Sequence, residues 1–197
     1  MQNLSLKIFE KDKKFKWSKN IIIVVSLTSL ALLYWLDNKV LNSTFENILV
    51  YSLIALGIFM IYAKISSYFN RENIPGKFNG KLTFSFNSIS IKNSEYSLSE
   101  ITKVHIVACD YTDRLNSLYG FDGHRSNGID NSIEITLNNL EIIHSNFQLN
   151  YENQLWKIEN ILIHYCKNNK LSYYNLLNIL NLTDYNQIQK FKKKHCL

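Results

Sequence analysis

Two long runs without a charged residue constrain this chain more than any other feature. They cover residues 20–36 and 47–63, each 17 residues long, and consist mainly of Ile, Leu and Val. A helix of that length is about 25 Å long at about 1.5 Å per residue, which is near the lower limit for crossing a bilayer. A hairpin buried in a soluble core would normally keep a polar stripe, and a cleaved signal peptide would need small residues after the first run. The runs therefore predict a transmembrane helical hairpin over residues 20–66.

Positive charge flanks the two runs and is scarce between them. Residues 1–19 hold six lysines against two acidic residues, the connection over residues 37–46 holds only Lys39, and basic residues accumulate again after residue 63. This asymmetry predicts an integral protein of the cytoplasmic (inner) membrane with both termini, including the basic segment 1–19, in the cytoplasm. The net charge of +6 then needs no nucleic-acid partner, because anionic headgroups attract such flanks.

A strand pattern begins after a linker over residues 67–79, which contains the only proline of the chain. Apolar and polar residues alternate over residues 82–86 and 89–91, and again over 101–110, 133–137 and 140–149, as in half-buried strands. Apolar residues then recur at helical spacing over 155–165, after a candidate cap at Asn150. We expect a sheet domain over 80–168 with a closing helix, and a basic tail over 169–197 with two shorter helices capped by Ser172 and Thr183.

The order of two spans, a short linker, a strand meander and a closing helix resembles bacterial membrane-anchored PH-like (pleckstrin-homology-like) proteins. The residues that carry the resemblance are Gly80 to Phe84 and Tyr96 to Ile101. It implies an α+β membrane protein in which the two-helix hairpin precedes a small antiparallel PH-like sheet or barrel capped by a C-terminal helix. It also implies a binding or scaffolding module. The first hairpin turn, Asn87 and Ser88, lacks the basic residues that hold phosphates in the phosphoinositide-binding branch, so no specific phosphoinositide binding is expected.

No motif with a well-understood catalytic mechanism occurs in the sequence. The three cysteines and five histidines lack the spacing of a disulfide framework or a metal site. We therefore expect no enzyme, cofactor or metal.

The one polar concentration is the loop over residues 110–130. It is interpreted as a solvated connection, as a partner-contact loop or as a cation site. As a contact loop it would use aromatic and basic side chains, namely Arg114, Tyr119, Phe121, His124 and Arg125.

Four lysines near the carboxyl end form a second basic cluster: Lys190, Lys192, Lys193 and Lys194. They are candidates for nonspecific contact with anionic lipid, and the alternative is a solvated terminus. The functional hypothesis is a non-enzymatic membrane protein whose cytoplasmic PH-like domain binds a protein partner or acts as a scaffold. The alternative is a small accessory subunit of a membrane transport or signalling complex, recognised through its spans.

Overall fold

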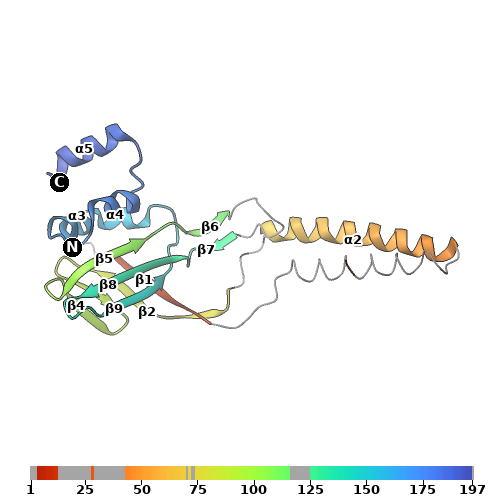
Figure 1. Ribbon diagram of the computed structural model, residues 1–197, viewed down its shortest axis with the longest axis horizontal. Helices are drawn as coiled ribbons and strands as arrows, with labels where there is room; N and C mark the ends of the chain where they lie inside the picture. Colours follow the sequence, from red (N-terminus) through yellow and green to blue (C-terminus); the bar gives the residue numbers. More distant parts are fainter. Residues whose placement is uncertain are drawn as a thin grey trace. The chain divides into compact units, whose positions relative to one another are not determined.

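The computed structural model describes residues 4–12, 28, 43–69, 71, 74–115 and 125–196 (Figure 1). Two compact units divide the chain. The first contains residues 1–12, 72–114 and 126–197, and the second contains residues 13–71 and 115–125. The first unit holds nearly all of the buried apolar side chains of the described residues, and it carries the sites discussed below.

A seven-stranded sheet is the framework of the first unit, with the strand order β4-β3-β2-β1-β9-β8-β5. Every neighbouring pair in this sheet is antiparallel. Its strands are β1 (Leu4–Lys11), β2 (Gly76–Phe84), β3 (Ser88–Ile91), β4 (Ser94–Ser97), β5 (Ile101–Val107), β8 (Asn131–Leu137) and β9 (Ile142–Phe147). A separate two-stranded sheet pairs β6 (Thr112–Leu115) with β7 (Arg125–Asn127), within the segment that the sequence predicted as a loop.

The central strand β1 was not predicted from the sequence. It lies between β2 and β9 and pairs with β2 along nearly its whole length. Leu6 and Ile8 are buried in the core, whereas Lys7 faces outward. Residues 4–11 of the basic amino-terminal segment are thus an integral part of the sheet. The predicted fold class, a transmembrane hairpin followed by a self-contained PH-like sheet, is wrong: the structure is a mostly antiparallel sheet with a few helices.

Four short helical segments follow β9: η1 (Gln154–Ile158), α3 (Glu159–Lys167), α4 (Tyr173–Ile179) and α5 (Tyr185–His195). The helix predicted over residues 155–165 is present, but its first turn is the 3-10 segment η1 and its cap is not Asn150. Ser172 does cap α4, since its hydroxyl accepts a hydrogen bond from the Asn175 N–H at 3.2 Å. Asp184, the neighbour of the predicted Thr183, caps α5.

Helix α3 is held against the sheet by Tyr165, whose ring is fully buried. The phenol O–H donates to the Ser85 carbonyl at 2.6 Å and lies 3.2 Å from the Ser88 carbonyl, at the turn between β2 and β3. Burial raises the pKa of this phenol. The aromatic ring therefore fills the core, and its hydroxyl group satisfies backbone carbonyls of the β2–β3 turn.

Helix α4 covers the free edge of β5. The buried Asn175 amide accepts from the Ile106 N–H at 2.9 Å and donates to the Ile106 carbonyl at 2.7 Å, so it replaces a missing strand partner. The Val104 N–H donates to the Lys170 carbonyl at 2.7 Å in the segment before α4. Covering an edge in this way prevents uncontrolled pairing with other strands.

No helix among the described residues has both the length and the apolar character needed to span a membrane. The second predicted span lies in α2 (Ser43–Phe69), a helix of 27 residues. Its uncharged run covers only 17 of them, residues 47–63, and charged residues lie directly before and after that run. That run is shorter than the roughly 20 apolar residues of a typical span. The first predicted span, residues 20–36, lies outside the described residues apart from Thr28. The predicted transmembrane hairpin, the integral-membrane localisation and the cytoplasmic placement of both termini that followed from it are therefore corrected.

Candidate functional site

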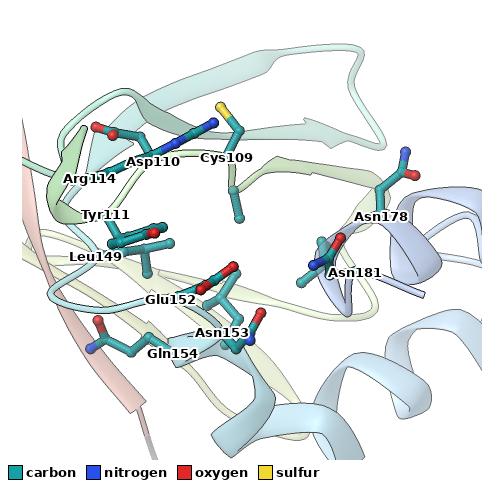
Figure 2. A pocket seen from close by; sticks show the side chains of 13 residues that line it. Cys109, Asp110, Tyr111, Arg114, Leu149, Glu152, Asn153, Gln154, Asn178 and Asn181 are labelled. Atoms are coloured by element: carbon teal, nitrogen blue, oxygen red, sulfur yellow. The ribbon is translucent and has the colours of Figure 1, made fainter. Parts of the chain in front are cut away.

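A cavity of about 490 Å³ lies in the first unit, where the segment after β5 meets the turn after β9 and the end of α4 (Figure 2). We call it the amide pocket, because side-chain amides make up much of its wall: Asn153, Gln154, Asn178 and Asn181. Two of them, Asn153 and Asn181, occupy left-handed backbone positions with φ near +59° and +51°. Asparagine tolerates this conformation better than most residues, so local turn geometry places these amides at the pocket.

A buried side-chain amide supports the part of the pocket wall that Cys109 and Asp110 form, at the top of Figure 2. Asn131 is 1% exposed, and its side-chain oxygen accepts from the backbone N–H groups of Cys109 (3.1 Å) and Asp110 (2.9 Å). Its side-chain nitrogen donates to the Gly128 carbonyl at 2.9 Å. One side chain therefore fixes the course of the wall over residues 109–110.

The Asp110 carboxylate serves the same framework. It accepts from the Ser126 hydroxyl at 2.6 Å and from the Asp130 N–H at 3.1 Å. Gly128 lies beside this cluster with φ +69°, and a Cβ there would stand 2.2 Å from the Leu149 carbonyl oxygen. Only glycine allows the two chain segments to approach so closely. Asp110 is thus occupied by structural hydrogen bonds.

Two charged side chains of the pocket are not occupied in this way. Arg114 from β6 and Glu152 from the turn before η1 lie on opposite sides of the cavity, and the Glu152 carboxylate points into it (Figure 2). Both residues are exposed. In the part of the chain that the structure describes, neither forms an ion pair or a side-chain hydrogen bond. A ligand can therefore meet both charges without displacing a protein partner.

The predicted contact-loop residues have different outcomes. The structure places Arg114 at the amide pocket and Arg125 in β7, where it is exposed. Tyr119, Phe121 and His124 lie outside the described residues. Glu152 and the pocket amides were missed, because isolated Asn and Glu residues carry no motif. The abundance of asparagine in turn-like contexts was the only available signal.

The predicted lipid-contact residues lie on α5, and their side chains are exposed: Lys190, Lys192, Lys193 and Lys194. Lipid contact itself stays a prediction. Elsewhere on this helix, His195 lies 3.4 Å from the Glu159 carboxylate, an ion-pair distance without hydrogen-bond geometry. This contact attaches the end of α5 to the start of α3.

Metal-type residues do not gather in the described ranges: no three His, Cys, Asp or Glu side chains there are grouped as a metal would require. The cysteines at 109, 166 and 196 are unpaired thiols. Burial raises the pKa of the Cys166 thiol, which disfavours the reactive thiolate.

The side chains that line the amide pocket can form hydrogen bonds and ion pairs with a ligand.

Comparisons with known protein families, curated proteins and solved structures found no match to this chain.

Proposed function

We propose that the first unit is a non-enzymatic protein-binding module, and that the amide pocket receives a polar peptide segment of its partner. The observation that carries the proposal is the contrast within the pocket wall. Asn131 and the wall residue Asp110 form hydrogen bonds that hold the wall, whereas Arg114 and Glu152 lack partners among the described residues. A rigid frame that presents free polar groups is what a recognition site requires.

A peptide matches the chemistry of the pocket better than a purely ionic ligand. Side-chain amides both donate and accept hydrogen bonds, which is the pattern of a peptide backbone. The pocket offers such groups from Asn153, Asn178 and Asn181, none of which has a side-chain hydrogen bond within the described ranges. The single positive and single negative free charges, Arg114 and Glu152, also favour a segment that carries both signs over a polyanion.

Site-specific crosslinking tests the proposal. A photoreactive amino acid at Asn178 should crosslink the partner, and the same group at exposed Lys103 on β5 should not. Replacing Arg114 and Glu152 together by Ala should reduce partner recovery about tenfold or more, because two charge-assisted contacts are lost. The matched control replaces one base and one acid elsewhere, Lys103→Ala with Glu134→Ala, and should leave recovery unchanged. Equal recovery with both double variants, at unchanged thermal stability, would rule out the pocket as the contact site.

A further inference from the structure

A second cavity, of about 620 Å³, lies on the sheet itself between β1, the β3–β4 hairpin and β9. We call it the split cavity. Its apolar lining comes from Ile8, Ile91, Tyr96 and Ile143, of which the first two are buried core residues. It shares no lining residue with the amide pocket, so the two sites can be tested separately.

The sheet is incomplete beside this cavity. Strand β9 pairs with β8 over all six of its residues, but with β1 only through Asn146 and Phe147. The Gln148 N–H still donates to the Lys7 carbonyl at 2.9 Å, so residue 148 directs its backbone groups toward β1. Because this direction alternates along an antiparallel strand, His144 and Ile142 direct theirs the same way. On the side that faces β1, the described residues provide no strand partner for these two positions, although both pair with β8 in the register of the sheet.

A serine hydroxyl at this cavity also has no partner in the ranges that the structure describes. Six polar residues are buried among the described ones, and five of them have side-chain hydrogen bonds: Asp110, Ser126, Asn131, Gln154 and Asn175. The sixth, Ser145, lines the split cavity and forms no hydrogen bond through its hydroxyl within the described part of the chain. The buried atoms that lack a partner among these residues are Tyr173 Oη and His195 Nε2, so the Ser145 oxygen is not sealed in the core and is available to a ligand in the cavity.

The charges at the rim do not favour an anionic occupant. Lys11 forms an ion pair with Asp130 at 2.5 Å, and Lys92 is paired with Glu10. Hydrogen bonds from Lys92 and Asn79 lower the pKa of Glu10, so its carboxylate stays charged and keeps Lys92 engaged. With these charges paired, three features remain for a ligand at the cavity: an open strand edge, a serine hydroxyl and an apolar lining, beside the polar side chains of Asn93, Ser94, His144 and Asn146.

We propose that the split cavity binds an extended, uncharged peptide segment that pairs with the open edge of β9 at residues 142–144 and places an apolar side chain against Ile8, Ile91 and Ile143. Of the candidate neutral ligands, a peptide satisfies all three free features. Its backbone continues the ladder, a backbone group reaches Ser145, and alternate side chains enter the cavity. An acyl chain would fill the apolar lining but would leave the strand edge and the hydroxyl unpaired.

The test uses the full chain and a short capped peptide of alternating threonine and valine, labelled for fluorescence anisotropy. Two comparison ligands separate the modes of binding: the same peptide with N-methylated backbone amides, and dodecanoate. The N-methylated peptide cannot donate to a strand edge and should bind at least about tenfold more weakly. Dodecanoate should not displace the unmodified peptide.

Variants of the protein locate the peptide. His144→Pro removes the β9 donor that faces β1 without removing a bond to β8, and should weaken binding about tenfold. His144→Ala removes the same side chain but keeps the backbone donor, so it should weaken binding much less than His144→Pro does. Ser145→Ala should weaken binding about fivefold, the equivalent of one hydrogen bond, and it remains informative should the proline variant fail to fold.

Three results would overturn the proposal. One is the absence of peptide binding at about millimolar concentration, and another is equal binding of the N-methylated peptide. The third is displacement by dodecanoate together with no effect of Ser145→Ala, which would make the cavity an acyl-chain site. None of these results bears on crosslinking at the amide pocket, because the two sites have no residue in common.

Discussion

Replacement of Asn131 by Ala should be among the most damaging single changes in the first unit. The side chain is 1% exposed and satisfies four backbone groups, namely the N–H groups of Cys109 and Asp110, the Gly128 carbonyl and, at 3.4 Å, the Phe147 carbonyl. The four losses differ in cost. The Asp110 N–H is in a buried hydrogen bond, whereas Cys109 is exposed and its N–H can reach water.

The expected loss follows from these differences. An orphaned buried N–H costs about 1–3 kcal/mol, and each hydrogen bond whose partner keeps another bond or meets water costs about 0.5–1.5 kcal/mol. Gly128 belongs to the second kind, because its carbonyl still accepts from the Leu149 N–H at 2.8 Å. Together these terms lower the free energy of unfolding by about 3 kcal/mol. For a chain of this size that corresponds to a fall in Tm of about 9 °C.

Urea denaturation followed by far-ultraviolet circular dichroism measures this loss, with the slope of the transition compared between variants. Asn139→Ala is the matched control, because Asn139 is an exposed asparagine in the turn between β8 and β9 and should change stability by less than about 0.5 kcal/mol. Partner crosslinking at the amide pocket should fall along with stability, because residues 109–110 lose their support. A loss below about 1 kcal/mol for Asn131→Ala would refute the view that this amide organises the pocket wall.

Five further changes test other parts of the structure. Burial raises the pKa of the Tyr165 phenol, so folding favours the protonated form. The contribution of this phenol to stability is complete below the ordinary tyrosine pKa of about 10. It declines as the pH rises through the folded-state pKa. Tyr165→Phe should remove that alkaline decline, and denaturation at a series of pH values would show whether it persists. Gly128→Ala should lower the free energy of unfolding by about 3 kcal/mol or more, because the new Cβ would collide with backbone atoms at positive φ. Gly57→Ala in α2 meets open space and should stabilise the helix by up to about 1 kcal/mol. Thermal melts measure both changes. Ile135→Asp should prevent folding, since its side chain is fully buried in the sheet and an unpaired charge there costs several kcal/mol; a native-like spectrum would contradict the core assignment. Deletion of residues 1–12 should also abolish the sheet signal, because it removes the strand between β2 and β9.

Local sequence pattern determined those elements whose stability depends on near neighbours. The alternation over residues 133–137 predicted β8, and Ser172 predicted the start of α4, because side-chain direction and capping act over a few residues. The same reasoning failed over the apolar run at 47–63. There a high apolar content over 17 residues suggested a membrane span that the structure does not support.

The tertiary structure decided everything that depends on distant partners. Strand β1 carries an alternating pattern too short and too rich in lysine to be recognised alone, and it is defined by pairing with β2 more than 60 residues later in the chain. Asn175 looks like an ordinary polar helix residue until Ile106, 69 positions away, offers an unpaired strand edge. The amide pocket likewise joins segments near residues 110, 152 and 180. The strand order determines which backbone groups are left unpaired beside a polar side chain. A side chain next to such groups becomes a buried support, and one without them stays free to bind a ligand.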